Sequence, residues 1–334
     1  MAKADKTVVV TGGNSGLGFE AARAIVQQGD GWHVVIAGRS PQRCEEAASR
    51  LSRDTGIPHV EAMMLELASL AAVRQFASDF SAGDRPPLRA LVCNAGVQHV
   101  GPTQRTEDGF ESTLGVNHLG HFLLANLMLR HLEAPGRIIF VSSGTHDPGQ
   151  RSGMPSPQLR QARSMAAPDD AEDARRHPGT VGRRRYSTSK LCNVLCTYEM
   201  DRRLKGGGTS PPDRPITVNA FDPGAMPGTG LARGYGPAAR FAWNSLGTLL
   251  CWTLRPFHAN IHRPKDSGRA LARLVLDPAL EGVSGRYFEG FVEIRSSEES
   301  YDEAKAAALW EQSAELVGLS HDGAFRRPDT AVPA

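Results

Sequence analysis

The chain has 334 residues, of which 40% are hydrophobic, and 38 Lys and Arg against 36 Asp and Glu leave a formal net charge of +2. This near balance of charge argues against a dedicated binder of nucleic acids or other polyanions. The five cysteines are an odd number without a Cys-x-x-Cys pair, which excludes a typical disulfide scaffold or zinc module and favours a reducing compartment. The length suffices for one large α/β domain with a buried core.

The N-terminal segment and the apolar runs of the chain bear on its location. The first predicted strand begins within the first ten residues, so we expect no signal peptide. No run approaches the roughly 18 apolar residues that a membrane-spanning helix needs. We therefore expect a cytoplasmic protein with no nucleic-acid partner, no transmembrane segment and no metal. The oligomeric state stays open at this point.

Short β-branched runs alternate with amphipathic patterns through the first half of the chain. The sequence predicts strands at 7–10, 32–37, 60–65, 88–93 and 137–142. It predicts helices at 17–28, 42–53, 70–80 and 108–132, and a last one at 301–319. This alternation indicates parallel β-α-β units. We expect a single Rossmann-type α/β domain over residues 1–320, with a doubly wound parallel sheet of about seven strands, and a flexible tail at 321–334.

Two segments interrupt this rhythm. Residues 147–185 contain five Pro, eight Arg and five acidic residues, and we expect a surface insertion that is disordered in part. Residues 238–262 are rich in Trp, Phe and Leu, with no charge between Arg240 and Arg255. We interpret this second segment as a substrate lid, with core packing and peripheral membrane contact as the alternatives.

The loop after the first strand is rich in glycine, with the spacing G-x-x-x-G-x-G. Glycines allow a diphosphate to approach the backbone, and the helix N-terminus that follows binds anions through its free N–H groups and dipole. A plain tight turn would use similar glycines, but the position directly after the first strand favours a dinucleotide site. The predicted cofactor contacts in this loop are Gly12, Asn14, Ser15, Gly16, Leu17 and Gly18.

The end of the second strand indicates which dinucleotide binds. An acidic residue there would bind the ribose hydroxyls of NAD, whereas this sequence has Arg39 followed by Ser40. A guanidinium can make charge-assisted bonds to a 2′-phosphate, so we predict NADP(H), the alternative being that Arg39 is a solvated surface residue. Further cofactor contacts are expected after the third and fourth strands, from Glu66, Leu67, Asn94, Ala95 and Gly96.

Tyr186 and Lys190 are spaced by four residues in a helical pattern and therefore lie on one helical face. A phenol titrates near pH 10, and a nearby ammonium lowers its pKa toward the working range of an acid–base catalyst. Pairs of this spacing are common on helix surfaces, so the pair gains meaning only from the motifs around it. Two histidines of the preceding helical run, His118 and His121, are interpreted as packing residues rather than metal ligands.

The candidate motifs follow one another in the order Thr11-Gly12…Gly18, Asn94-Ala95-Gly96, Asn117, Ser142-Ser143, Tyr186…Lys190 and Asp222-Pro223-Gly224. This order resembles the short-chain dehydrogenase/reductase superfamily over most of the chain. The resemblance implies that Tyr186 exchanges a proton with a substrate carbonyl, while Lys190 holds the nicotinamide ribose and lowers the pKa of Tyr186. It implies that Ser143 hydrogen-bonds the substrate oxygen and that Asn117 supports a water-linked proton relay. The nicotinamide end is expected to meet Pro223, Gly224 and Thr229.

A narrower resemblance comes from the runs N-H-L-G-H-F-L-L and S-K-L-C-N, and from the C-terminal segment. They look like the branch that contains retinol dehydrogenases and light-dependent protochlorophyllide reductases. The photoenzymes of this branch carry a Cys after the Pro-Gly pair, where this chain has Ala225; Cys192 and Cys196 lie elsewhere and are expected in the core. We therefore expect a dark NADPH-dependent reductase of a bulky apolar substrate. The alternatives are a light-dependent protochlorophyllide reductase and a non-catalytic NADP(H)-binding sensor.

Overall fold

The structure, a computed structural model, describes residues 3–28, 30–169, 177–206, 215–226 and 260–319. Several sequence predictions fall outside these residues: Thr229, the proposed lid except for residues 260–262, and the tail at 321–334. Residues 170–176 of the predicted insertion are also outside them.

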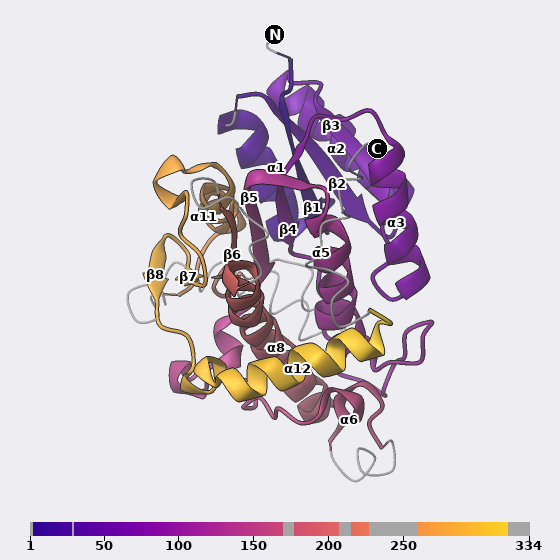
Figure 1. The fold of residues 1–334 in the computed structure, drawn as a ribbon, viewed down its shortest axis with the longest axis vertical. Helices are drawn as coiled ribbons and strands as arrows, with labels where there is room; N and C mark the ends of the chain where they lie inside the picture. The colour runs from indigo at the N-terminus through magenta and orange to yellow at the C-terminus, as the bar shows by residue number, and fades with distance from the viewer. Residues whose placement is uncertain (1–2, 29, 170–176, 207–214, 227–259, 320–334) are drawn as a thin grey trace, which may run out of the picture.

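Within the described residues, a central sheet of eight strands has the order β3-β2-β1-β4-β5-β6-β7-β8 (Figure 1). The strands are β1 (Lys6–Thr11), β2 (Trp32–Gly38), β3 (Val60–Met64), β4 (Leu88–Cys93), β5 (Leu132–Val141), β6 (Ile216–Asp222), β7 (Tyr287–Glu289) and β8 (Val292–Ile294). Neighbouring strands pair in parallel from β3 to β7, and β8 pairs antiparallel to β7. This confirms the predicted doubly wound parallel sheet and adds one antiparallel edge strand.

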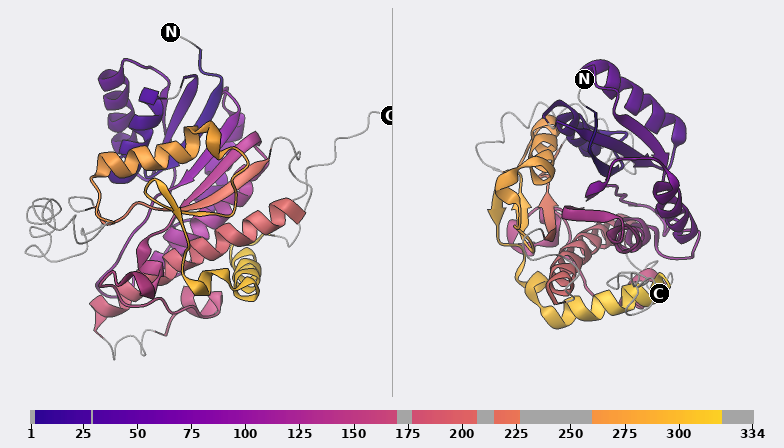
Figure 2. Two further views of the ribbon diagram at one scale, coloured as in Figure 1. Left: turned by 90° about the vertical axis from the view of Figure 1, so that its left-hand side faces the viewer. Right: turned by 45° about the horizontal axis from the view of Figure 1, so that its top comes forward.

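Helices cover both faces of the sheet. They are α1 (Gly16–Gln28), α2 (Pro41–Thr55), α3 (Leu70–Ala82), α4 (Ser112–Leu114), α5 (His121–Leu129), α6 (Ala162–Ala166), α8 (Pro178–Gly206), α11 (Pro264–Leu276) and α12 (Glu303–Leu316). One core cluster joins Val8 and Val10 to α1, α2 and α11, and the other joins Val9 to α3, α5, α8 and α12. Alternate residues of a buried strand face opposite sides, so both sides of β1 must be apolar. Figure 2 shows α11 and α8 on opposite sides of the sheet.

The ends of α2 follow local chemistry that the sequence already indicates. The hydroxyl of Ser40 accepts a hydrogen bond from the backbone N–H of Arg43, and Pro41 is the first helical residue. Gly56 ends the helix with a φ of 72°, a left-handed conformation that suits glycine, and its N–H donates to the Ser52 carbonyl.

The predicted helix at 108–132 is wrong in its bounds and its regularity. The Glu111 carboxylate accepts the backbone N–H groups of Thr113 and Leu114, each at 2.9 Å, so the helical segment begins only at Ser112. A π-helical turn at Gly115–Gly120 then separates α4 from α5. Strand β5 also starts earlier than predicted, because Leu132 already pairs with Leu88 of β4.

The segment at 147–185 is better packed than its composition indicates. Ala162 and Ala166 of α6 are each 1% exposed and belong to the core cluster that includes α8 and α12. Residues 178–185 form the first turns of α8 and not part of the predicted insertion. Small alanines can be buried without any large apolar side chain, which is why composition alone missed this packing.

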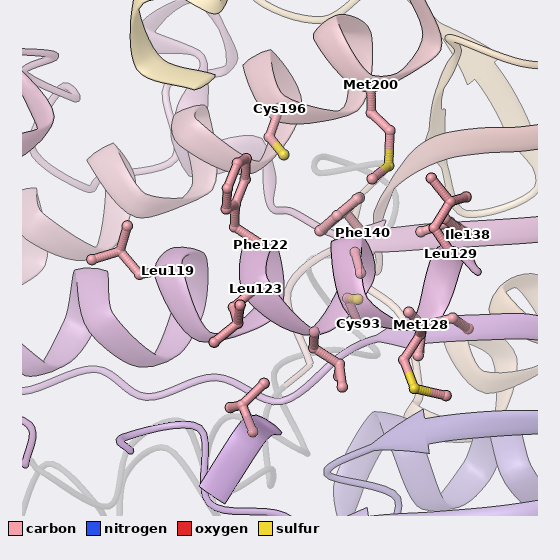
Figure 3. Packing of buried hydrophobic residues seen from close by; sticks show 14 of the residues in the cluster. Cys93, Leu119, Phe122, Leu123, Met128, Leu129, Ile138, Phe140, Cys196 and Met200 are labelled. Carbon is pink, nitrogen blue, oxygen red and sulfur yellow. The ribbon is translucent and has the colours of Figure 1, made fainter. Parts of the chain in front are cut away.

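The core between β5, α5 and α8 is shown in Figure 3, with Phe122, Phe140 and Cys196 among the labelled side chains. Cys192 and Cys196 are buried there, which confirms their predicted place in the core. Burial raises the pKa of the Cys192 thiol to about 12, so this group stays protonated at neutral pH. No helix in the described part of the chain combines the length and hydropathy needed to cross a bilayer.

Candidate active site

The predicted motifs meet at the carboxyl ends of neighbouring strands. Thr11 ends β1, Cys93 ends β4, Val141 ends β5 and Asp222 ends β6, and each is followed directly by a candidate loop. The strand order reverses direction between β1 and β4, and ligands of open α/β sheets bind at the edge of the sheet beside such a reversal. Residues that are far apart in the sequence therefore lie at the same edge of the sheet.

The glycine loop after β1 has three different local environments. Gly12 and Gly16 have positive φ angles of 66° and 57°, which side chains rarely adopt. A Cβ at Gly16 would meet nothing within 4 Å, so the backbone at the start of α1 is open to an approaching group. A Cβ at Gly18 would lie 2.5 Å from Nδ2 of Asn94 and 2.6 Å from the Gly12 carbonyl oxygen. Gly12 thus makes the turn, Gly16 leaves the backbone open, and Gly18 permits close packing.

Thr11 ties this loop to the turn after β4. Its hydroxyl oxygen accepts the backbone N–H of Asn94 at 2.8 Å and that of Ala95 at 2.9 Å. The Asn94 side chain in turn donates from Nδ2 to the Thr11 carbonyl at 2.7 Å. Thr11 stands at the start of the glycine motif in the sequence, and in the structure it fixes the position of Asn94 and Ala95.

The predicted cofactor contacts at the ends of β2 and β3 differ in how exposed their side chains are. The Arg39 side chain is exposed, and no acidic side chain of the described residues forms an ion pair with it. Asn14 lies beside the end of β2, with its Oδ1 3.4 Å from where a Cβ at Gly38 would be. Glu66 is half-buried and its Oε1 accepts the N–H of Ala68 at 2.9 Å, while Leu67 is buried in the core. Arg39 is thus a cation at this edge with no ion-pair partner among the described residues.

Lys190 is held at the centre of the site. Its side chain is 3% exposed, and Nζ donates to the Val141 carbonyl at 2.9 Å and lies 5.5 Å from the ring centre of Tyr186. The Ser142 hydroxyl donates to the Lys190 carbonyl at 2.9 Å, which ties α8 to the end of β5. Burial lowers the pKa of Lys190 to about 8, and the negative charge of Asp222 partly opposes this change.

Asn117 lies in the π-helical turn and contacts the same region. Its Oδ1 accepts the N–H of Val97 at 2.7 Å, and its Nδ2 donates to the Val97 carbonyl and to the Ser189 hydroxyl, both at 3.0 Å. A Cβ at Gly96 would lie 3.3 Å from Oδ1 of Asn117 and 3.7 Å from Nζ of Lys190. The structure therefore brings Gly96, Asn117 and Lys190 together, as predicted.

Ser143 follows β5 in an extended conformation and is partly exposed. Its hydroxyl oxygen accepts the N–H of Thr145 at 3.3 Å, which leaves its own O–H able to donate to a substrate oxygen. Its carbonyl accepts a hydrogen bond from Nδ1 of the buried His146 at 2.7 Å. A neutral serine hydroxyl in this place suits hydrogen bonding to a polarised oxygen and not nucleophilic attack, because no base contacts Oγ within the described residues.

The loop after β6 is shaped by Asp222. One carboxylate oxygen accepts the N–H of Gly224 at 2.9 Å, and Gly224 has a φ of 74°. The other carboxylate oxygen and that of Glu289 both accept Nδ2 of Asn260 at 2.9 Å. Burial and the charge of Asp222 raise the pKa of Glu289. This link to β7 has no sign in the sequence, because Asn260 and Glu289 belong to no local motif.

Among the described residues, no group of three or more His, Cys, Asp or Glu side chains is arranged to hold a metal ion. His118, one of the two histidines considered above, bonds through Nε2 with the Ser313 hydroxyl of α12 at 3.0 Å. His121 was predicted to serve packing alone, but its contacts reach Thr11 and Asn117.

Comparisons with known proteins agree with this geometry. The model of the family described as short chain dehydrogenase matches residues 6–154. The chain is 36% identical to human retinol dehydrogenase 13 over 97% of this chain and 88% of that one, and 36% identical to zebrafish polyprenol dehydrogenase over 94% and 87%. It is 35% identical to the chloroplastic protochlorophyllide reductase of Chlamydomonas reinhardtii, over 94% of this chain and 78% of that one.

Among solved structures, an uncharacterised protein from Mycobacterium paratuberculosis superposes with a TM-score of 0.66 at 28% identity, covering 95% of each chain. These similarities span nearly the whole chain and include the strands and helices that carry the site. The chain belongs to the short-chain dehydrogenase/reductase superfamily, in the branch that contains retinol dehydrogenases and protochlorophyllide reductases.

Proposed function

We propose that this oxidoreductase uses NADPH to reduce the carbonyl group of a bulky apolar substrate, or catalyses the reverse oxidation. One observation carries the proposal: the open glycine loop after β1 and the pair Tyr186 and Lys190 lie at one edge of the sheet, with Asn117 and Gly96 beside Lys190. Cofactor and acid–base groups of a hydride-transfer enzyme must meet in this manner.

The residues present fit a dinucleotide. The uncrowded backbone at Gly16 and the free N–H groups at the start of the 13-residue helix α1 would hold the diphosphate. Gly96 and the loop at Pro223 and Gly224 would border the nicotinamide end, and Thr229, outside the described residues, is proposed there on family resemblance alone. When bound, the reduced nicotinamide supplies the hydride.

The remaining chemistry belongs to the chain. Tyr186 donates a proton to the developing alkoxide, and the ammonium of Lys190 beside it favours the phenolate that remains. The Ser143 hydroxyl donates a hydrogen bond to the same oxygen, which stabilises charge as it develops. Asn117 orients the surroundings of Lys190 through its bonds to Val97 and Ser189.

The choice of NADPH over NADH rests on Arg39. Its exposed guanidinium at the end of β2 occupies the position where an acidic residue would repel a 2′-phosphate. A phosphate there would gain charge-assisted hydrogen bonds from Arg39, with Ser40 as a second donor. The test is the ratio of kcat/KM for NADPH and NADH, which we expect to favour NADPH.

The apolar substrate class is supported by composition and by the relatives. Two of them are named for retinol and polyprenol, which are long apolar alcohols. The proposed lid at 238–262 of this chain is rich in Trp, Phe and Leu, and this composition suits the covering of such a molecule. Small hydrophilic ketones would gain little from such a cover and should be poor substrates.

A light-driven reductase of protochlorophyllide is the second candidate, because the Chlamydomonas enzyme is 35% identical. Ala225, which follows Pro223 and Gly224, has only a methyl group and cannot deliver a proton at this position. A third candidate, a non-catalytic NADP(H) sensor, would not need Tyr186, Lys190 and Ser143 together. These observations favour the dark carbonyl reductase.

The deciding experiment measures NADPH oxidation against ketones, retinoids and protochlorophyllide, in darkness and under illumination. We expect dark turnover that is fastest with large lipophilic carbonyls. Strict light dependence with protochlorophyllide would establish the second candidate instead. Tight NADPH binding without turnover on any substrate would establish the sensor.

We also propose a cytoplasmic location. The four cysteines within the described residues are free thiols and buried, which is compatible with a reducing compartment. Fractionation with an antibody against the native protein would test it, and recovery in the membrane fraction would contradict it.

A further inference from the structure

His121 joins two parts of the site that are more than 100 residues apart in sequence. It is the first residue of α5 and is completely buried. Its Nε2 lies 2.9 Å from the Thr11 hydroxyl oxygen, and its Nδ1 lies 3.2 Å from the Asn117 carbonyl oxygen. One ring thus bridges the end of β1 and the turn that holds Asn117.

Counting donors and acceptors fixes the proton positions. A carbonyl oxygen only accepts, so Nδ1 of His121 must carry its proton to bond with Asn117. In a neutral ring Nε2 then accepts, and the Thr11 hydroxyl donates to it. The Thr11 oxygen is left with two lone pairs, and these accept the N–H groups of Asn94 and Ala95. Every polar atom of this buried chain is then satisfied.

A second acceptor competes for the Thr11 proton. The Val92 carbonyl lies 3.3 Å from the Thr11 hydroxyl, farther than His121 at 2.9 Å. Without an acceptor on residue 121, the hydroxyl would turn its proton to Val92 and rotate its lone pairs away from their present directions. The bonds to Asn94 and Ala95 depend on those directions.

On the other side of the ring, the π-helical turn supplies the Asn117 carbonyl as the acceptor for Nδ1 of His121. The backbone N–H of His121 donates to the His118 carbonyl instead of to the Asn117 carbonyl four residues earlier. The Asn117 carbonyl is therefore met by the imidazole side chain. Removal of the ring would leave this carbonyl without that donor, in the turn that positions the Asn117 side chain against Val97 and Ser189.

We propose that His121 is a positioning residue, which holds the cofactor-facing turn at Asn94 and Ala95 and the turn at Asn117 in register through a neutral, Nδ1-protonated ring. The proposal rests on the proposed function only in that these two turns are taken to face the cofactor. The ring is completely buried, so it acts through the two turns that it bonds.

The electrostatics of the pocket keep the ring neutral. The pKa of His121 is lowered to about 3, and burial is the largest cause. The bond to Asn117 opposes this change in part, whereas the charges of Lys190 and His118 add to it. A doubly protonated ring would also lose the ability to accept from Thr11. The arrangement therefore persists at every pH at which the protein is handled.

The first test is independent of catalysis. Nitrogen-15 NMR of histidine-labelled protein without cofactor distinguishes a protonated from an unprotonated ring nitrogen, and the His121→Phe spectrum identifies the signals that belong to residue 121. We expect a protonated Nδ1 and an unprotonated Nε2, unchanged from pH 5 to pH 9. An Nε2-protonated ring, or a ring that titrates in this range, would overturn the proposal even if the enzyme is active.

The second test measures the dissociation constant for NADPH in His121→Phe, with His118→Phe as the matched control. Both variants replace a buried histidine. His118 belongs to the π-helical turn, but its side chain bonds to Ser313 of α12 and contacts neither the Thr11 hydroxyl nor the Asn117 carbonyl. We expect His121→Phe to weaken NADPH binding about tenfold or more, since buried partners lose their bonds. His118→Phe should lower thermal stability and leave the dissociation constant unchanged.

A conservative variant completes the test. The amide oxygen of His121→Gln can accept from Thr11, so this variant should recover most of the NADPH affinity lost in His121→Phe. Equal affinities for wild type and His121→Phe would overturn the proposal, as would equal losses in His121→Phe and His118→Phe. If wild type does not bind NADPH at all, the proposed function fails, while the NMR result still decides whether His121 has the assigned tautomer.

Discussion

Burial of Lys190 has a measurable cost that depends on pH. The pKa of this side chain falls from the ordinary value of 10.5 to about 8. Each unit of pKa difference corresponds to ~1.4 kcal/mol, so protonated Lys190 destabilises the folded state by about 3 kcal/mol at neutral pH. Between pH 8 and 10.5 the unfolded chain binds a proton that the folded chain has lost. The stability contribution of Lys190 therefore becomes less unfavourable as the pH rises through this window.

Lys190→Met removes this dependence while preserving the length of the side chain. The bond from Nζ to the Val141 carbonyl is lost, but Nδ2 of Asn193 still donates to that carbonyl at 3.3 Å. We expect the variant-minus-wild-type difference in the free energy of unfolding to be about 2.5 kcal/mol larger at pH 7 than at pH 10, which means that the variant gains more stability at pH 7. Turnover should be lost, because the variant lacks the ammonium beside Tyr186.

Urea unfolding of both proteins at pH 7 and pH 10 gives this difference directly, since the other titrating groups are common to both and cancel. Lys205→Met, at an exposed position of the same helix, is the matched control for exchanging lysine for methionine. The reasoning would be refuted if wild type and Lys190→Met differed in free energy of unfolding by the same amount at both pH values. Such a result would show that Lys190 is not desolvated in the folded protein.

Three further predictions concern the cofactor and the proton donor. Tyr186→Phe should reduce turnover ~10³-fold without weakening NADPH binding; near-normal turnover would contradict the assigned role. Arg39→Asp should shift the kcat/KM ratio from NADPH toward NADH by ~10–100-fold, and an unchanged ratio would show that Arg39 does not meet the phosphate. Gly18→Ala places a Cβ 2.5 Å from Nδ2 of Asn94, so it should lower the free energy of unfolding by ~1–3 kcal/mol and weaken NADPH binding. Gly101→Ala, where a Cβ meets nothing within 4 Å, should change neither in equilibrium denaturation and fluorescence titration.

Local patterns were sufficient for the parallel sheet and for most of its helices. Apolar runs such as Val8 to Val10 can be satisfied only with both faces covered, and Ser40 with Pro41 marks a helix start through bonds made within one turn. The glycine spacing likewise predicts a loop whose three glycines have distinct environments. Each of these signals acts over a few residues, which is why the sequence reveals them.

Other features depend on contacts between distant segments. The helix predicted at 108–132 contains a π-helical turn, and the insertion at 147–185 buries Ala162 against the core; neither has a local sign in the sequence. Asn260 and Glu289 meet Asp222 only because β6 and β7 are neighbours in the sheet.

The sequence alone was sufficient for the fold class, because apolar runs and helical periods are local patterns. It also predicts the cofactor loop from the spacing of its glycines, and the acid–base pair from the order of the motifs along the chain. Only the tertiary structure decided which groups surround that pair. Hydrogen bonds from Lys190 to Val141 and from Thr11 to His121 join residues that folding brings together across the sheet edge. The protonation states of buried groups also depend on the tertiary structure. The free energy of a buried charge is set by the protein groups that replace water around it, and these groups come from distant parts of the sequence.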